Sequence, residues 1–412
     1  MSESRQQQFE RLVLTESGAA GDPGAALVAA DYFLDHDLPR LAASAFDRAY
    51  GLNPADEGVA RLRSNLLEEL SVQEHGLHFR YVPAGTFVMG SEQGDPDERP
   101  TRDVRLNDFW VADVPMTWST MASLLGYSAP PEAWPVGADG EPDFSFEMNE
   151  KNKIRLQYCE TETQQAGDHH AHAPDQIWSA NGRQVTAEEL FGRVPREDPS
   201  MPFAYNVKPV VAVSWQEAEE LAEGLSTAET LYHLPTEAQW EKAARGGLIG
   251  QRYSWGSEPP DPGRCDCDHF GDWYIQNPLR LPPNGYGLHG MCGGVWEWTQ
   301  DDYDALAYHE PPQRPEGADG VASRSATESL ARRGLLARML GFVRRRSAAD
   351  DHTVERVLRG GSWADCKEMV TVSCRMSRAS AHWRSEQRCT AFTPTVGFRL
   401  FRTEIAGPHV DL

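Results

Sequence analysis

Cysteine is scarce in this chain, and long apolar runs are missing from it. The 412 residues include seven cysteines, a small and odd number that favours a reducing compartment over a disulfide scaffold. No run of about 18 apolar residues occurs, so we expect no membrane-spanning helix. The polar N-terminal stretch lacks the apolar core of a signal peptide. These features predict a cytoplasmic protein.

Positive charge is also in short supply. Lysine and arginine number 39 against 62 acidic residues, and the formal net charge of −23 would repel phosphate over most of the surface. We therefore expect no nucleic-acid partner. Hydrophobic content of 40% and charged content of 25% are those of a globular protein.

Residues 1–76 carry a helical pattern. Apolar side chains recur at helical spacing between residues 25 and 70, and the run from Ala45 to Pro54 resembles the second helix and exit turn of a tetratricopeptide repeat. Only one repeat is visible, and such repeats bury their apolar faces against neighbours. We expect this segment either to pack on the rest of the chain or to recruit a protein partner.

From Leu77 the pattern changes to short strands. Residues 78–83, 84–90 and 102–114 alternate in polarity, and a short helix is expected after them. Further along, Ser214 and Glu217 have the spacing of a capping box. Thr236 is the predicted N-cap of a second helix with acidic residues in its first turn.

The stretch from Asn284 to Trp298 combines five glycines with two tryptophans on either side of Glu297. In an extended segment Trp296 and Trp298 face one way and Glu297 faces the other. A carboxylate beside the carbonyls of a glycine-rich loop suits a hard cation such as Ca²⁺. The alternative is a buried aromatic corner in which Glu297 pairs with an arginine.

A series of motifs runs through the chain in a fixed order. They include Val-Pro-Ala-Gly-Thr-Phe-Val-Met-Gly, Gly-Val-Trp-Glu-Trp, Arg-Gly-Gly-Ser-Trp and Gly-Phe-Arg, and they lie at residues 82–90, 213–215, 234–245, 253–256, 283–288, 294–298, 359–363 and 397–399. Together they resemble the formylglycine-generating enzyme (sulfatase-modifying factor) family. The resemblance implies an α+β, C-type-lectin-like domain with little regular structure at 77–403. It also implies insertions at about 126–208 and 302–355, and leaves a tail at 404–412.

The family contains copper-dependent oxidases that convert a peptidyl cysteine into formylglycine, lectin-like halves of non-haem iron sulfoxide synthases, and binding proteins. In the oxidases, two cysteines five residues apart follow the Gly-Gly-Ser motif and hold copper. Here Cys366 takes the first position, Thr371 takes the second, and Cys374 lies further on. Two thiolates select Cu(I) and one does not, so conventional formylglycine generation is not expected.

Cys366 and Cys374 nevertheless remain the candidate catalytic thiols. Nearby positive charge from Arg375 and Arg378 would lower the pKa of Cys366. The alternative is that both cysteines are small buried hydrophobes. The candidate substrate-binding residues are Trp363, Arg375 and Arg378.

The resemblance also implies calcium ligands. One set consists of the Glu297 carboxylate and the carbonyls of Met291, Gly293 and Val295. Gly290 stands where relatives have Asn or Asp, which removes one oxygen. A second family site falls on Asp266 or Asp268. The cysteines of the same stretch, Cys265 and Cys267, are too close together and too isolated for an ordinary zinc site.

The two insertions carry further candidates. His169, His170 and His172, with Cys159 and Asp175 nearby, are suited to a non-haem iron site, and a histidine-rich solvent loop is the alternative. Residues 329–346 predict a basic amphipathic helix that docks on the acidic body or binds an anionic membrane surface or an acidic partner.

Two functions therefore remain open. The first is a metal-dependent oxidase acting on a thiol-containing peptide or small molecule, with copper or non-haem iron. The second is a catalytically inactive C-type-lectin-like binding module whose N-terminal segment recruits a partner.

Overall fold

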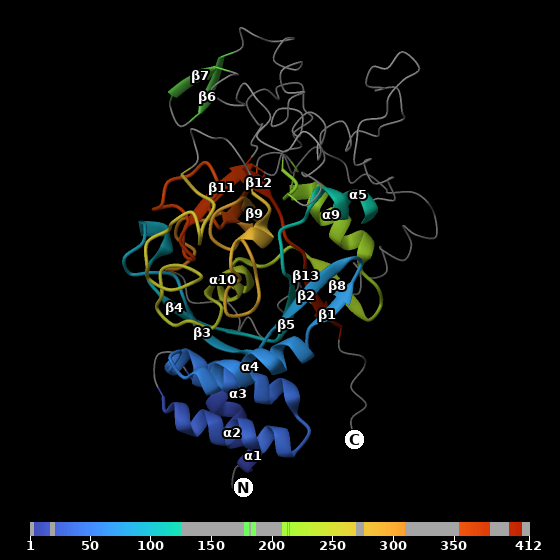
Figure 1. Ribbon diagram of the computed structural model, residues 1–412, viewed down its shortest axis with the longest axis vertical. Coiled ribbons are helices and arrows are strands. Elements are labelled where there is room, and N and C mark those ends of the chain that lie inside the picture. The colour runs from blue at the N-terminus through green and yellow to red at the C-terminus, as the bar shows by residue number, and fades with distance from the viewer. Residues whose placement is uncertain are drawn as a thin grey trace.

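Four N-terminal helices form a layer against a mixed α+β body in this computed structural model (Figure 1). The structure describes residues 4–16, 21–124, 177–180, 183–186, 208–211, 213, 215–268, 276–309, 354–379 and 395–405. The four helices are α1 (Arg5–Leu14), α2 (Pro23–Asp35), α3 (Pro39–Leu52) and α4 (Glu57–Glu69). The helices predicted between residues 25 and 70 are therefore confirmed.

Local sequence explains where these helices begin. Ser4 and Gln7 form a capping box at the start of α1, and the Asp22 and Asp56 side chains cap α2 and α4. Proline is the first residue of α2 and α3, where its missing N–H costs nothing. None of the helices in the described ranges is long and apolar enough to cross a membrane.

Two curled sheets make the body. The first has the order β1-β2-β5-β13-β8 and the second has the order β11-β10-β9-β12. Their strands are β1 (Val72–Glu74), β2 (Leu77–Val82), β5 (Phe109–Ala112), β8 (Thr230–His233), β13 (Phe401–Glu404), β9 (Trp296–Asp302), β10 (Glu355–Arg359), β11 (Arg375–Ala379) and β12 (Val396–Gly397). Only the β9–β12 pair is parallel among these neighbours. The first sheet thus pairs strands from the beginning of the body's sequence with β13 from its end.

Outside the two sheets, the described residues form a hairpin of β3 (Gly85–Met89) and β4 (Arg102–Leu106), a strand pair of β6 (Ile177–Ala180) and β7 (Arg183–Thr186), and four helices besides α1 to α4 and α10 (Glu237–Arg245). The helices are η1 (Pro96–Glu98), α5 (Trp118–Leu124), α9 (Trp215–Leu225) and η3 (Pro278–Arg280). The strands predicted at 78–90 and 102–114 and the short helix after them are confirmed.

Helix α10 (Glu237–Arg245) lies in the middle of the body (Figure 1). The predicted cap is confirmed, because Thr236 forms a capping box with Gln239. Gly246 ends the helix at a φ of 60°, a left-handed conformation that favours glycine. All nine residues of α10 are buried, including its charged ones. A helix buried all round must pair its charges internally.

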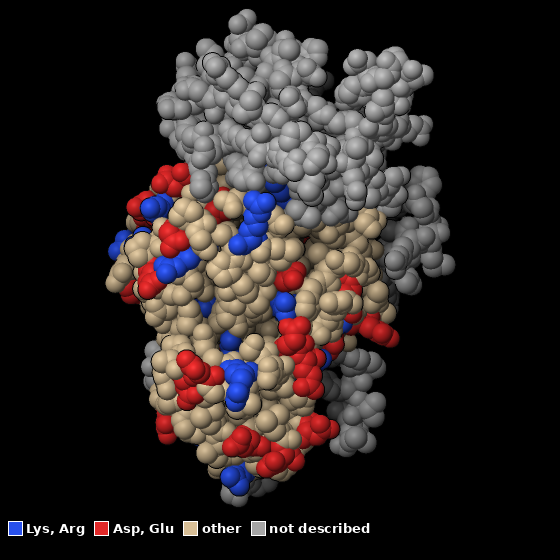
Figure 2. Space-filling view, in the orientation of Figure 1, with Lys and Arg blue, Asp and Glu red and all other residues tan. Residues whose placement is uncertain are grey.

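One hydrophobic core joins the N-terminal helices to the body. It contains Ala29 and Phe33 of α2, Phe46 of α3, Phe79 of β2 and Trp240 of α10. The first alternative for residues 1–76, packing on the rest of the chain, is therefore confirmed. The resemblance to a tetratricopeptide repeat stays a prediction. On the face shown in Figure 2, acidic side chains gather over the lower part, where these helices lie.

Candidate functional site

Strand β9 presents the Trp-Glu-Trp motif with its side chains on alternate faces, as predicted. The Trp296 indole donates to Asp365 Oδ2 at 2.7 Å, and the Trp298 indole donates to the Val213 carbonyl at 2.9 Å. Both rings are buried and both indole N–H groups are paired. The two tryptophans therefore anchor β9 to two other segments of the body.

Glu297 points the other way, into a fully buried position. Its Oε1 accepts from Arg399 Nη2 at 3.0 Å, and its Oε2 accepts from the Trp240 indole at 2.8 Å. Arg399 Nε lies 3.2 and 3.1 Å from the two oxygens. The arginine pair that was the alternative to a calcium ligand is confirmed. A guanidinium in this place also repels a cation, which opposes a calcium role for the Glu297 carboxylate.

The two stretches predicted as separate calcium sites lie against each other. Asp266 and Gly293 form a parallel β-bridge, and the Gly294 N–H donates to the Asp266 carbonyl at 2.8 Å. A Cβ at Gly293 would lie 2.4 Å from that carbonyl oxygen, so only glycine fits. The Asp266 carboxylate accepts from the backbone N–H of Gln276 at 3.0 Å.

Metal-ligating side chains are not clustered in the described part of the chain. No group of three or more His, Cys, Asp or Glu side chains that could hold a metal occurs there. Calcium at the carbonyls of Met291, Gly293 and Val295, or at Asp266 or Asp268, stays a prediction. His169, His170, His172 and the segment 329–346 lie outside the described residues.

Cys366 lies on an exposed turn that follows the Arg-Gly-Gly-Ser-Trp motif. The turn is held by the Met369 N–H, which donates to the Cys366 carbonyl at 3.0 Å, and by the Asp365 carboxylate, which accepts from the Ser362 N–H at 2.9 Å. Partial burial and a hydrogen bond to Glu368 raise the pKa of the Cys366 thiol. The prediction that nearby arginines lower this pKa is therefore wrong.

Cys374 has different surroundings. It is buried, and its N–H donates to the Thr371 hydroxyl at 3.1 Å. Burial, followed by the negative charge of Glu98, raises the pKa of its thiol to about 12. Cys374 is thus a neutral buried thiol at neutral pH, which was the alternative to a catalytic role. Thr371, at the family's second cysteine position, is buried as well.

Among the three predicted substrate-binding residues, the prediction for Arg375 is wrong. Its side chain is fully buried, and its Nε donates to Glu237 Oε1 at 2.6 Å. Its Nη1 donates to the carbonyls of Asp97 and Asp304, at 2.9 and 3.1 Å. No surface of this side chain is left for a substrate. Trp363 is buried and Arg378 is exposed, and their substrate roles stay predictions.

Sequence reasoning missed the buried charge network to which Arg375 belongs. Glu237, Glu241 and Arg245 follow one another at i,i+4 spacing on α10, a spacing that could have revealed it. Arg359 donates from Nη2 to Glu241 and from Nη1 to the Ser373 carbonyl at 2.6 Å. The arginine of the Arg-Gly-Gly-Ser-Trp motif therefore fixes α10 to the segment before Cys374, which is a structural task.

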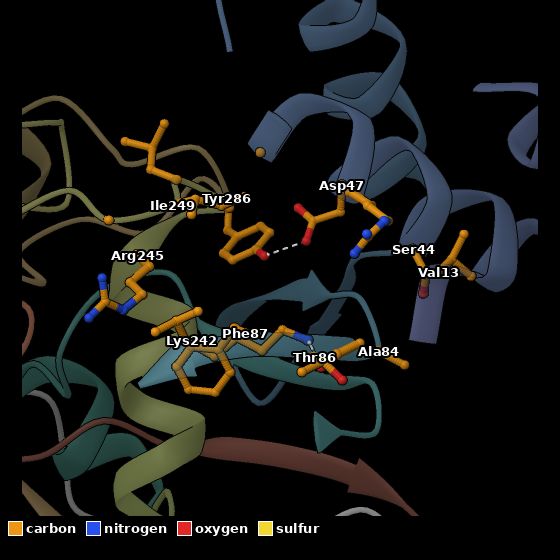
Figure 3. Close-up of a pocket in the computed structure, with 17 residues that line it drawn as sticks. Val13, Ser44, Asp47, Ala84, Thr86, Phe87, Lys242, Arg245, Ile249 and Tyr286 are labelled. Atoms are coloured by element: carbon orange, nitrogen blue, oxygen red, sulfur yellow. Dashed lines mark hydrogen bonds between the residues drawn. The ribbon is translucent and has the colours of Figure 1, made fainter. Parts of the chain in front are cut away.

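A small cavity lies between the N-terminal helices and the body (Figure 3). The Tyr286 hydroxyl donates to Asp47 at 2.9 Å beside it, and Lys242 Nζ donates to the carbonyls of Pro83 and Gly85 at 2.5 and 3.2 Å. Burial lowers the pKa of Lys242 to about 8. The volume of about 60 Å³ has room for a few waters. Small-molecule sites usually need about 300 Å³ or more, so this cavity is no substrate pocket.

Comparison with known proteins places this geometry in a family. The model described as "Sulfatase-modifying factor enzyme 1-like domain" matches residues 66–404. A formylglycine-generating enzyme of Streptomyces coelicolor is 30% identical over 59% of this chain and 75% of that protein. The inactive C-alpha-formylglycine-generating enzyme 2 of Bos taurus is 29% identical over 54% of this chain and 70% of that protein.

A solved structure, that of PvdO from Pseudomonas aeruginosa, covers 81% of this chain and 96% of its own at 18% identity and a TM-score of 0.46. The family match spans most of the chain, from the end of α4 to the last residue of β13, and it includes every strand that the structure describes. This chain belongs to the formylglycine-generating enzyme (sulfatase-modifying factor) family and has its α+β, C-type-lectin-like fold.

Proposed function

We propose that this chain is a ligand-binding member of the family that does not perform the copper-dependent, two-cysteine oxidation. The observation that carries the proposal is that Cys366 lacks a second available thiol where the family's oxidases have one. Thr371 stands at the second cysteine position, and Cys374 is buried and neutral at neutral pH because the pKa of its thiol is raised to about 12. The charged neighbour that affects the pKa of Cys366 is Glu368, whereas Glu98 and Arg359 affect the pKa of Cys374.

The residues present do not fit a copper ion held by two thiolates. Such a site needs two deprotonated cysteines that share one ion. The pKa of both thiols is raised, and their charged neighbours differ. We therefore assign no oxidation step to Cys366.

A metal-dependent oxidase acting on a thiol-containing peptide or small molecule is the second candidate. It is favoured by the exposure of Cys366 beside the Arg-Gly-Gly-Ser-Trp turn and by the name of the Streptomyces relative. The histidines at 169–172 would supply its remaining ligands. For either function we infer a cytoplasmic location, which the free thiols of all five described cysteines support.

Labelling of the two cysteines with iodoacetamide tests the proposal. Tryptic cleavage after Arg359, Lys367 and Arg375 places Cys366 and Cys374 on separate peptides. We expect Cys366 to be labelled slowly at neutral pH. Its labelling rate should rise as the pH approaches or exceeds the ordinary thiol pKa of about 8.5. Cys374 should react only on unfolding, and copper should change neither rate. Cys366→Ser is the control variant, and as an exposed change it should shift stability by no more than about 0.5 kcal/mol.

Three results would contradict the binding proposal in favour of the oxidase. The first is joint protection of both peptides by copper. The second is copper or iron at one ion per chain after purification. The third is conversion of a cysteine-containing peptide to an aldehyde under oxygen, lost in Cys366→Ser. Absence of transition metal and of aldehyde supports the binding module.

A further inference from the structure

Three buried thiols meet beside the loop that carries the Trp-Glu-Trp motif. Cys265, Cys267 and Cys292 are all buried and free. The Cys265 thiol donates to the Cys292 carbonyl at 3.1 Å. The side chains of Cys265 and Cys267 are in contact with each other, whereas the Cys292 thiol contacts Ser254. The cluster therefore contains one thiol pair and one neighbour that is not part of it.

The backbone explains why this pair forms. Asp266 lies between the two cysteines and is extended, because it forms a parallel bridge with Gly293. In an extended segment, residues two apart point to the same face. Cys265 and Cys267 thus share one face, while the Asp266 carboxylate faces away toward Gln276. The space beside the Cys265 sulfur is tight, since a Cβ at Gly293 would lie 2.7 Å from it.

The two thiols differ in their access to solvent. The single proton of the Cys265 thiol is directed at the Cys292 carbonyl. Cys267 is 8% exposed and Cys265 is 1% exposed. The Asp268 N–H donates to the Asp365 carbonyl at 2.8 Å, which places Cys267 near the exposed turn of Cys366. Cys267 is thus the thiol that a reagent reaches first.

We propose that Cys265 and Cys267 form a reversible dithiol–disulfide pair, a redox site that does not depend on the function proposed above. The oxidant is a low-molecular-weight disulfide such as glutathione disulfide. The Cys267 thiolate attacks one sulfur and releases one glutathione thiolate. Cys265 then gives up its proton, attacks the Cys267 sulfur and releases the second glutathione. Two protein thiols are oxidised, and one disulfide is reduced to two thiols.

Closing this bridge changes the local structure. In an extended chain, residues two apart have Cα atoms about 6.6–6.8 Å from each other, at the outer limit of about 4.4–6.8 Å for a disulfide. The segment therefore has to bend, which disturbs the Asp266–Gly293 bridge and the contact of Asp268 with Asp365. Such a strained bridge is readily reduced again by excess thiol.

A redox titration of the full chain tests the pair. The folded protein is equilibrated at neutral pH in glutathione buffers of increasing disulfide content, quenched with acid, alkylated and digested with trypsin. Cleavage after Arg264 and Arg280 gives the peptide 265–280, which contains both cysteines and no others. We expect this peptide to change from doubly alkylated to unalkylated and two hydrogens lighter. The ratio of the two forms should change about tenfold for a tenfold change in the squared concentration of glutathione divided by the concentration of glutathione disulfide.

Variants separate this pair from its neighbour. Cys292→Ser should keep the titration, and Cys267→Ser should abolish it while the far-ultraviolet circular dichroism stays native. The wild-type titration decides the matter even if a variant fails to fold. A peptide that stays doubly alkylated in every buffer while the chain is folded would overturn the proposal. So would a disulfide from this peptide to Cys292 or Cys366, or one that forms only after denaturation.

Discussion

The carboxylate of Glu297 receives hydrogen bonds from Arg399 and Trp240 and is shielded from solvent. Burying two charges costs several kcal/mol of desolvation, which their attraction and further hydrogen bonds offset. Arg399 makes those further bonds to the carbonyls of Ala112 and His289, at 2.9 and 2.7 Å. This pair joins β9 to the end of β5 and to the loop that carries His289, so its removal affects more than one element.

Replacing the acid tests this role. Glu297→Gln keeps the shape but leaves Arg399 buried and uncompensated, so we expect a loss of about 3–5 kcal/mol in the free energy of unfolding. Urea denaturation measures the loss. The control is Glu404→Gln, which breaks the exposed ion pair with Arg40 at 2.7 Å and should cost less than about 1 kcal/mol. If Ca²⁺ stabilises the wild type and Glu297→Gln removes that gain, the carboxylate is a metal ligand.

At the scale of elements, strands β8 and β13 are joined through His233. Its Nε2 contacts the Thr403 hydroxyl at 2.8 Å and its Nδ1 contacts the Leu234 carbonyl at 2.7 Å. A carbonyl only accepts, so Nδ1 carries the proton and the neutral ring accepts from Thr403. Burial lowers the pKa of His233 to about 4. The folded chain therefore binds this proton less readily than the unfolded chain.

A pH series should show this difference. Between a pH of about 6.5 and about 4 the unfolded state binds the proton and the folded state does not, so stability falls as pH falls through this window. The difference between the pKa of about 6.5 in the unfolded state and about 4 in the folded state corresponds to roughly 3 kcal/mol in the free energy of unfolding. We expect His233→Gln to flatten this part of the acid limb in urea denaturation. His36→Gln, at an exposed histidine, should leave the limb unchanged. An acid limb unaltered by His233→Gln would contradict the assignment.

Local pattern was enough to predict many of these elements. The alternation at 78–90 and the cap at Thr236 depend on residues close in sequence, so they could be read directly. The partner of Arg375 could not, because Glu237 lies 138 residues away and the two meet only through the sheet order. Closeness in sequence therefore assigns the charge of Arg375 to Cys366, whereas in the fold this charge is paired with Glu237.

At the scale of the whole molecule, Arg63 connects the N-terminal helices to the body. Its guanidinium lies 4.5 Å from the Tyr50 ring centroid and 4.7 Å from that of Tyr286. It donates to the carbonyls of Gly285 and Gly246, at 2.6 and 3.1 Å. The family match begins at residue 66, yet this arginine of α4 and the core residues of α2 and α3 reach across that boundary. We therefore expect the helices and the body to unfold together.

Arg63→Ala tests this coupling. The side chain is 2% exposed. Its loss removes the donor of two carbonyls of the body and leaves Asp47 with the Tyr286 hydroxyl in place of a charged partner. We expect a loss of about 3–5 kcal/mol in the free energy of unfolding, with one transition seen by both tryptophan fluorescence and far-ultraviolet circular dichroism. Arg61→Ala, at an exposed arginine of the same helix, should stay within about 0.5 kcal/mol of wild type. If Arg63→Ala instead melts helical signal first while the tryptophan transition keeps its wild-type midpoint, the helices are a separate folding unit, and the arginine is only a local contact.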